Sequence, residues 1–144
     1  MQAKWFFFDP DQALKESAAL FLKNWNANAT FQIKSSGTTG LPELHVFDKK
    51  QLTHSAQASI GAFGLHKDVR ALLCLPISSV GGLMLMARSI VGNFELQLQV
   101  PSARPLQNLS QQIDFVALVP TQLQQSIEFD LEKLKKIDQI LIGG

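Results

Sequence analysis

The stretch Ser35-Ser36-Gly37-Thr38-Thr39-Gly40 places four hydroxyl residues and two glycines at six consecutive positions. Glycines let the backbone turn sharply and approach a ligand closely, while hydroxyls and free amides serve as hydrogen-bond donors. Such a loop suits phosphate oxygens, which accept many short hydrogen bonds. The same composition is also typical of a plain turn between two strands. Composition alone therefore leaves a phosphate site and an ordinary turn both open.

The order of the residues excludes a Walker-type phosphate loop at this position. That loop requires a glycine, four residues and then Gly-Lys-Ser/Thr at the start of a helix. No lysine follows Gly40, and Leu44-His45-Val46-Phe47 is typical of a strand. An unrelated phosphate- or nucleotide-binding module stays an alternative, although neither a Walker lysine nor a Walker-type aspartate supports it.

The composition predicts a single folded domain over residues 1–144. A chain of 144 residues with 46% hydrophobic residues is long and apolar enough to bury a core. A net charge of +1 gives no sign of binding to nucleic acid or to an anionic membrane surface. Cys74 is the single cysteine, which excludes an intrachain disulfide, and its apolar surroundings predict an inert core residue. This cysteine content favours a reducing, cytoplasmic location.

Targeting, membrane and metal signals are weak throughout the sequence. Trp5–Phe8 is too short for the core of a signal peptide, and Asp9-Pro10-Asp11 ends it. The apolar stretch from Val80 to Gly92 is also short and is interrupted by Arg88, so we expect no membrane insertion. The histidines are scattered without matching carboxylates or cysteines, so we expect no metal site from them. They are His45, His54 and His66.

The first half of the chain predicts two helices around a pair of strands. Asp9 can cap the first helix, with Pro10 in its first turn, and the helix ends at 24–28. A second helix begins at Asp48 or Lys49, runs to about Phe63 and stops at Gly64. The expected strands are 30–33, before the hydroxyl-rich stretch, and 44–47, after it.

The second half of the chain alternates between strand and helix patterns. The continuous apolar run from Val69 to Leu75 favours a strand buried on both faces, as in a parallel sheet. Strands are also expected at 94–100, 114–119 and 137–142, and helices at 81–91, 106–112, 120–129 and 131–136. This alternation predicts an α/β fold, with a mostly parallel sheet and helices on both faces.

Several loops with small or polar residues follow the expected strands. They are the hydroxyl-rich stretch, Pro76–Ser79, Val119–Thr121 and Gly143-Gly144. Ligands of open α/β sheets bind beyond the carboxyl ends of the strands. Ordinary strand-ending turns produce the same pattern, so position alone does not identify a ligand.

Four motifs resemble the adenylate-forming superfamily of acyl-CoA synthetases, luciferases and peptide-synthetase adenylation domains. The hydroxyl-rich stretch with Pro42 is similar to its Ser/Thr-Ser-Gly-Thr-Thr-Gly-x-Pro-Lys signature. Leu75–Leu83 resembles its Leu-Pro-x-x-His-x-x-Gly segment, and Val116–Thr121 its next strand and helix start. Leu141-Ile142-Gly143-Gly144 resembles the Gly-Gly beside the adenylate. The order and spacing of these motifs agree from about Phe31 to Gly144. The short lead before the hydroxyl-rich stretch, with Leu-Leu-Cys-Leu-Pro at 72–76 and Val-Pro-Thr-Gln-Leu-Gln-Gln-Ser at 119–126, most resembles the shortened o-succinylbenzoate–CoA ligases of menaquinone (vitamin K2) biosynthesis.

The resemblance implies the substrates and the site residues. Such an enzyme uses ATP, Mg²⁺ and CoA: a carboxylate attacks the α-phosphate of ATP, pyrophosphate leaves, and the CoA thiolate then displaces AMP. Its partners are small molecules, and the oligomeric state stays open. The phosphate-binding residues would be Ser35, Ser36, Gly37, Thr38, Thr39 and Gly40. The acyl and adenylate pocket would include Ser79, Gly81, Thr121, Gly143 and Gly144.

The chain departs from the family pattern at two positions and in its extent. Glu43 stands where the family usually has lysine, and Ser79 stands where many members have histidine. The family's Tyr-Gly-x-Thr-Glu segment, its ribose-binding aspartate and its C-terminal domain with the catalytic lysine would lie beyond Gly144. We therefore expect an N-terminal portion of a ligase, without catalytic residues in this span and inactive alone. A non-catalytic binding or interaction domain, and a ligase for another aryl or acyl carboxylate, stay open as alternatives.

Overall fold

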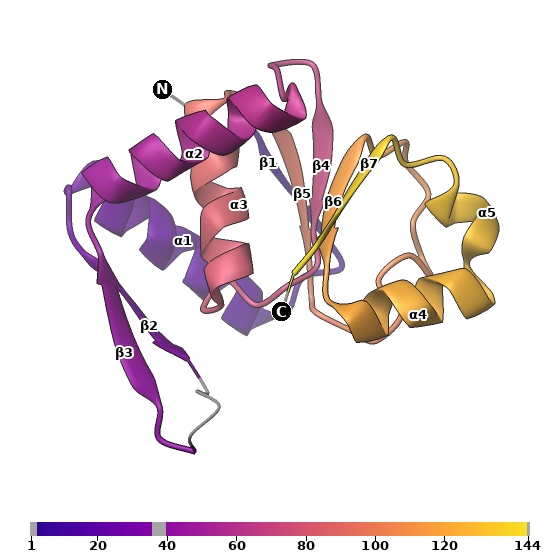
Figure 1. The fold of residues 1–144 in the computed structure, drawn as a ribbon, viewed down its shortest axis with the longest axis horizontal. Helices are drawn as coiled ribbons and strands as arrows, with labels where there is room; N and C mark the ends of the chain where they lie inside the picture. The colour runs from indigo at the N-terminus through magenta and orange to yellow at the C-terminus, as the bar shows by residue number, and fades with distance from the viewer. Residues whose placement is uncertain (1–2, 36–39, 144) are drawn as a thin grey trace.

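The computed structural model describes residues 3–35 and 40–143 (Figure 1). Strands and helices alternate along most of the chain, as the sequence predicts. In chain order the elements are β1 (Trp5–Phe8), α1 (Gln12–Asn26), β2 (Phe31–Ser35), β3 (Glu43–Phe47), α2 (Lys49–Phe63), β4 (Arg70–Leu73), α3 (Val80–Val91), β5 (Glu95–Gln99), β6 (Phe115–Leu118), α4 (Pro120–Phe129), α5 (Leu131–Leu134) and β7 (Gln139–Ile142).

Five of these strands form one parallel sheet in the order β1-β5-β4-β6-β7. Phe115 of β6 lies between Ala71 of β4 and Gln139 of β7, which sets the register at the centre of the sheet. The carboxyl ends of parallel strands lie at one edge, so the loops after β4, β6 and β7 come together there. The predicted α/β fold with a mostly parallel sheet is confirmed.

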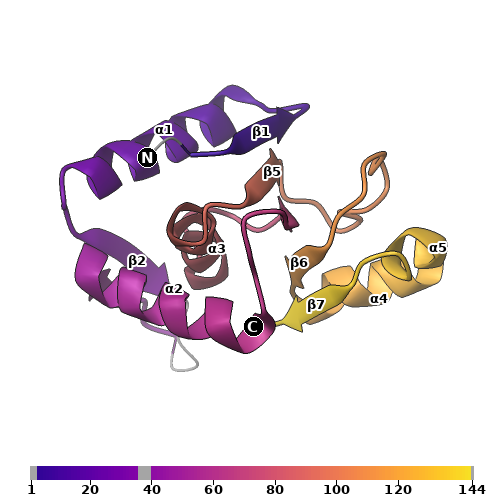
Figure 2. The same cartoon turned by 90° about the horizontal axis from the view of Figure 1, so that it is seen from above.

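Helices cover both faces of this sheet (Figures 1 and 2). α1, α2 and α3 lie on one face, and α4 and α5 lie on the other. Successive side chains of a strand point to opposite faces, so Ala71 and Leu73 pack with α1–α3. Leu72 and Cys74 pack on the other face, in a cluster that includes Leu134 of α5. Coverage of both faces explains why β4 is apolar at successive positions.

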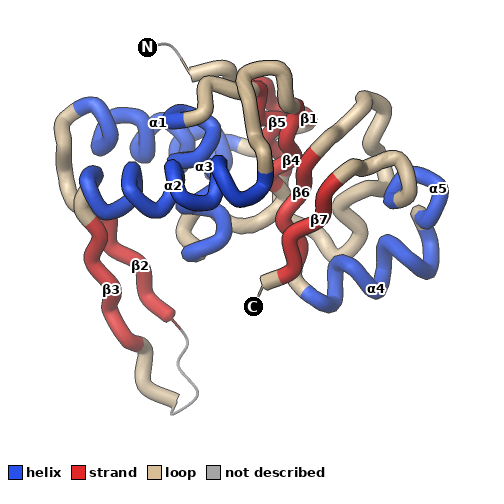
Figure 3. Tube along the Cα trace, turned by 45° about the horizontal axis from the view of Figure 1, so that its top comes forward, coloured by secondary structure: helices blue, strands red, loops and turns tan. Residues whose placement is uncertain are grey.

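β2 and β3 pair antiparallel and form a hairpin that is separate from the parallel sheet. The hairpin extends away from the helices (Figure 3). Its base is held by Phe31, which is buried and has its ring centroid 5.1 Å from that of Phe21 in α1. Beyond the base of the hairpin, Leu44 and Val46 of β3 are exposed. The hydroxyl-rich stretch therefore follows a strand of this hairpin and not a strand of the parallel sheet.

β1 is an edge strand that the sequence patterns do not reveal. Trp5 lies beside Leu96 of β5 in the parallel register. The indole nitrogen of Trp5 donates a hydrogen bond to the hydroxyl of Ser89 in α3, 84 residues away, at 3.0 Å. A short apolar stretch becomes a strand here because distant residues supply its partners.

The prediction of a helix at 106–112 is wrong, because this segment forms turns. The ammonium group of Lys133 donates to the carbonyl oxygens of Leu106 and Gln107, at 3.2 and 2.6 Å. The side chain of Leu106 is fully buried in the cluster on the α4–α5 face. A lysine from α5 thus satisfies carbonyl groups that helical amides would otherwise bond.

The ends of α2 match the sequence predictions, whereas the cap of α1 differs from the predicted residue. α2 begins at Lys49, one of the two predicted starts, and Asp48 is its cap. Gly64 ends the helix with a left-handed φ of 65°, as predicted. Asp9 was expected to cap α1, but it has φ of 41° and lies outside the helix. Asp11 is the cap instead, because its carboxylate accepts a hydrogen bond from the amide of Leu14 at 2.8 Å.

Candidate functional site

A cavity of about 590 Å³ opens at the carboxyl edge of the parallel sheet. Ligands of open α/β sheets bind at this edge, and pockets for small molecules commonly have such volumes. The lining comes from the end of β2, the turn after β4 with α3, and the ends of β6 and β7. The lining residues are Ile33, Lys34, Ser35, Leu75, Pro76, Ser79, Val80, Gly81, Met84, Arg88, Ala117, Leu118, Val119, Leu141 and Gly143.

Four residues predicted for the site line this cavity: Ser35, Ser79, Gly81 and Gly143. They belong to three separate segments of the chain: the end of β2, the start of α3 and the end of β7. The strand order β4-β6-β7 brings the last three together, because these strands are neighbours with a common carboxyl edge. The hairpin then carries Ser35 to the same cavity.

The other predicted site residues do not line the cavity or cannot be placed. Thr121 is exposed in the first turn of α4, and Gly40 is exposed beside the end of the hairpin. Neither contributes to the cavity lining. Five more lie outside the described residues, and their roles stay predictions: Ser36, Gly37, Thr38, Thr39 and Gly144.

Ser79 caps α3 at the rim of the cavity. Its hydroxyl oxygen accepts a hydrogen bond from the amide of Gly82 at 3.0 Å and donates to the carbonyl oxygen of Pro76 at 2.6 Å. The turn at Pro76 and the first turn of α3 approach so closely that a methyl group on Gly82 would overlap the Pro76 carbonyl. The proton of the Ser79 hydroxyl is therefore already donated within the chain. One lone pair of this oxygen is left for a ligand.

Glu43 lies opposite Ser35 in the hairpin. A carboxylate beside phosphate groups is unfavourable unless it points away from them. The Glu43 side chain is 70% exposed, and one of its oxygens lies 3.8 Å from Nε2 of His45. The structure therefore leaves this carboxylate accessible to solvent, beside the imidazole ring of His45.

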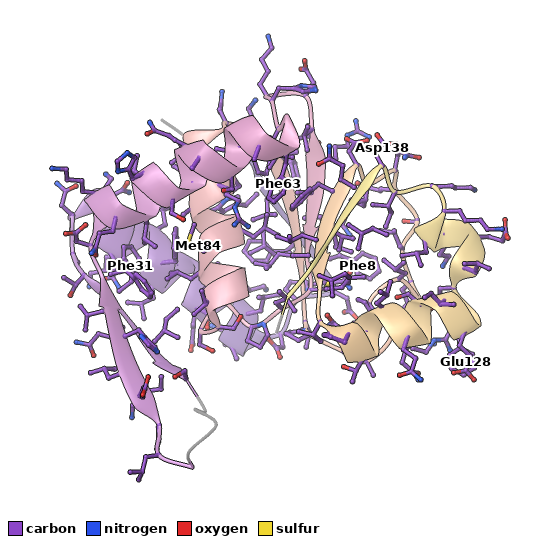
Figure 4. All side chains as sticks on the ribbon, viewed as in Figure 1. Phe8, Phe31, Phe63, Met84, Glu128 and Asp138 are labelled. Carbon is purple, nitrogen blue, oxygen red and sulfur yellow. The ribbon has the colours of Figure 1, made fainter. Side chains whose placement is uncertain are left out.

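Arg88 lines the cavity, although it was not among the predicted site residues. From the sequence it was noted only as a charge that interrupts an apolar stretch. It lies on α3 among Met84, Leu118 and other apolar lining residues. Met84 and Phe63, labelled in Figure 4, lie on the side of the sheet that α2 and α3 cover. Burial lowers the pKa of the Arg88 guanidinium from its ordinary value, yet arginine stays charged at neutral pH. A single cation within an otherwise apolar helix is the sequence feature that could have marked Arg88 as a candidate site residue.

Two other kinds of feature find no support in the part of the chain that the structure describes. In residues 3–35 and 40–143, no three His, Cys, Asp or Glu side chains are placed to hold a metal ion. In the same ranges, no helix is long and apolar enough to cross a membrane.

A scan against protein-family models and a search of curated proteins found no match. Solved structures are similar. An AMP-forming acyl-CoA synthetase/AMP-acid ligase II-like protein from Dyadobacter fermentans is 33% identical with a TM-score of 0.83, over 95% of this chain and 40% of that one. MenE from Escherichia coli, with a bound analogue of OSB-AMS, is 25% identical with a TM-score of 0.64, over 78% of this chain and 24% of that one.

A third similar structure shares the fold at lower identity. It is o-succinylbenzoate coenzyme A synthetase (MenE) from Bacillus subtilis, in complex with ATP and magnesium ion. Its identity is 24% and its TM-score 0.67, over 78% of this chain and 24% of that one. The chain thus spans less than half the length of each of these three proteins.

Proposed function

Because this chain belongs to the adenylate-forming superfamily, we propose that it forms the ATP-phosphate-binding and acid-binding portion of an AMP-forming acid–thiol ligase. In the proposed reaction a carboxylate oxygen attacks the α-phosphorus of ATP, and pyrophosphate leaves. The CoA thiolate then attacks the acyl carbon, and AMP leaves. The proposed acid is o-succinylbenzoate, as in menaquinone biosynthesis.

The observation that carries the choice of acid is a cation, Arg88, in a mostly apolar cavity. o-Succinylbenzoate has an aromatic ring and two carboxylates, of which one is adenylated. The other carboxylate keeps its charge and needs a partner when it leaves water. A guanidinium pairs with a carboxylate through two parallel hydrogen bonds, and apolar walls suit the ring. We assign the carboxylate that does not react to Arg88.

For ATP, we assign the phosphates to the stretch from Ser35 to Gly40. Pyrophosphate gains charge as it leaves, and hydroxyl and amide donors stabilise that charge without forming covalent bonds. Mg²⁺ prefers oxygen ligands and commonly binds through substrate phosphates. We therefore propose that Mg²⁺ arrives bound to ATP and would neutralise part of the negative charge of the phosphates.

Calorimetry with o-succinylbenzoate tests the acid site. Arg88→Met should weaken binding about 10-fold or more, because it removes a charged hydrogen-bond partner. Arg70→Met is the matched control, since Arg70 is about half exposed at the amino end of β4 and pairs with Glu95. The control should bind as the wild type does. Equal affinity of Arg88→Met and wild type would overturn the assignment of the acid.

Pyrophosphate release from ATP and o-succinylbenzoate tests the reaction. The chain spans 40% of the similar synthetase from Dyadobacter fermentans, and we propose that turnover also requires a further domain that carries the catalytic lysine. The 144-residue chain alone should therefore bind ligands without releasing pyrophosphate. Turnover by this chain alone would contradict that division of labour.

A non-catalytic binding domain is the second candidate, and two residues favour it. Glu43 replaces the usual lysine, and the Ser79 hydroxyl, which replaces histidine, is committed to capping α3. This candidate predicts ligand binding without pyrophosphate release, even when the further domain is present. The same release measurement on the longer protein separates the two functions.

A further inference from the structure

The guanidinium of Arg88 is held from α2 at two points. Its Nε atom donates a hydrogen bond to the hydroxyl of Ser59 at 2.7 Å. The ring of Phe63, one turn further along α2, has its centroid 6.0 Å from the central carbon of the guanidinium. Phe63 in turn packs against Phe115 of β6, with ring centroids 5.7 Å apart. An edge contact and a face contact thus fix the orientation of this cation.

The hydrogen-bond roles at Ser59 follow from its neighbours. Its hydroxyl donates into its own helix, to the carbonyl oxygens of Ser55 at 3.0 Å and Ala56 at 3.1 Å. A hydroxyl has one proton and two lone pairs. Since the proton points into the helix, a lone pair of Ser59 is available to accept from Arg88, which has donors only.

The contact with Ser59 occupies the inner edge of the guanidinium. Among the residues that the structure describes, the two Nη nitrogens of Arg88 donate no hydrogen bond, and no carboxylate forms an ion pair with this side chain. In the same residues, no fully buried side-chain nitrogen or oxygen lacks a partner. The Nη nitrogens are therefore accessible, and Arg88 lines the cavity.

We infer that Ser59 is a positioning residue that aims the Nη edge of Arg88 into the cavity, so that the site favours an acid with a second carboxylate over a matched acid with only one. This inference rests on the proposed function. A long side chain that is already oriented loses less conformational freedom when a ligand binds. Two parallel hydrogen bonds to a carboxylate also require a fixed guanidinium plane.

The experiment compares three acids by calorimetry on the same protein: o-succinylbenzoate, 4-oxo-4-phenylbutanoate and 2-butanoylbenzoate. The last two each lack one of the two carboxylates. Ser59→Ala should reduce the preference for the diacid roughly 10-fold, the value of one hydrogen bond to a charged group. Ser59→Thr keeps the hydroxyl and should keep the preference. Ser55→Ala, at an exposed serine one turn earlier on α2, should leave it unchanged.

A second measurement does not depend on ligand affinity. Hydrogen exchange of the Arg88 Nε–H, identified by its loss in Arg88→Lys, should be slow in the wild type and at least about 10-fold faster in Ser59→Ala. If Ser59 had only a structural role, Ser59→Ala would lower the melting temperature and leave the ratio of the affinities for the diacid and the monoacids unchanged.

The outcomes distinguish this inference from the proposed function. If the wild type prefers the diacid and Ser59→Ala keeps that preference, the positioning role of Ser59 is overturned and the proposed substrate stands. If the wild type has no preference for the diacid, the proposed substrate and the inference both fail. Loss of the preference in Ser59→Ala, with recovery in Ser59→Thr, supports both.

Discussion

The hydroxyl oxygen of Ser35 lies 3.2 Å from Nε2 of His45, across the paired strands of the β2–β3 hairpin. Ser35 begins the hydroxyl-rich stretch and also lines the cavity at the sheet edge. Ser35 therefore belongs to both the proposed phosphate site and the proposed acid site, and His45 contacts its hydroxyl. Either group can donate, depending on the tautomer of His45, so the loss of His45 removes the contact in both cases.

His45→Ala should lower the free energy of unfolding by about 1 kcal/mol, the net value of one intramolecular hydrogen bond. It should also weaken pyrophosphate binding, because the Ser35 hydroxyl loses the group that orients it. The control is His54→Ala, at an exposed position on α2, where we expect a change within about 0.5 kcal/mol. Urea unfolding and calorimetry with pyrophosphate measure the two effects. If His45→Ala binds pyrophosphate as the wild type does, the contact between His45 and Ser35 has only a structural role.

Glu43→Lys should strengthen pyrophosphate binding by roughly 5- to 10-fold, since it replaces a negative charge near the proposed phosphate site with a positive one. The gain should shrink as salt is added, because exposed charges are screened. Glu128→Lys makes the same charge change at an exposed position of α4 (Figure 4) and should have little effect. Equal gains in both variants would mean that net charge matters and the position does not.

Thr38→Val tests the phosphate role of a residue outside the described ranges. If its hydroxyl bonds a phosphate oxygen in the transition state, kcat/KM of the proposed full-length ligase should fall about 10- to 100-fold, as expected for one hydrogen bond to a charged group. The free energy of unfolding should change by less than about 0.5 kcal/mol. The reverse pattern, normal kinetics with lower stability, would identify a turn residue.

Gly82→Ala should destabilise the fold by about 3 kcal/mol or more, because the added methyl group meets a backbone carbonyl that cannot move aside easily. That carbonyl belongs to Pro76 and also accepts the hydroxyl of Ser79. Gly61→Ala is the matched control, since nothing lies within 4 Å of a methyl group at that helical position. The control should gain about 0.5–1 kcal/mol. Thermal unfolding of both variants gives the comparison.

Cys74 should make the fold less stable at alkaline pH. Burial raises the pKa of the Cys74 thiol from 9.0 to about 12. Above pH 9 the unfolded chain loses this proton while the folded chain keeps it, so the unfolded state binds fewer protons and stability falls with rising pH. The loss should grow between pH 9 and about 12 and reach the order of 2 kcal/mol near pH 10.5.

The pH effect is isolated by comparing wild type with Cys74→Ala in urea unfolding across this range. The variant should lose less stability per pH unit, whatever its stability at neutral pH. Parallel pH profiles for the two proteins would show that other groups cause the alkaline loss.

Local patterns determined most of the elements and the family. The apolar run through β4, the capping aspartate of α2 and Gly64 act through residues that are neighbours in the sequence, so their effects can be predicted from it. The order of hydroxyls and glycines in 35–40 likewise identified the superfamily without any knowledge of contacts.

Tertiary structure alone decided how these elements form a site. β1 became a strand through its pairing with β5, and the hairpin stayed separate from the parallel sheet. Arg88 meets Ser59 from another helix, 29 residues away. Such contacts depend on the packing of helices and strands that are distant in sequence. Periodicity and capping describe only a residue and its near neighbours, so they predict which elements form and not which side chains meet in the cavity.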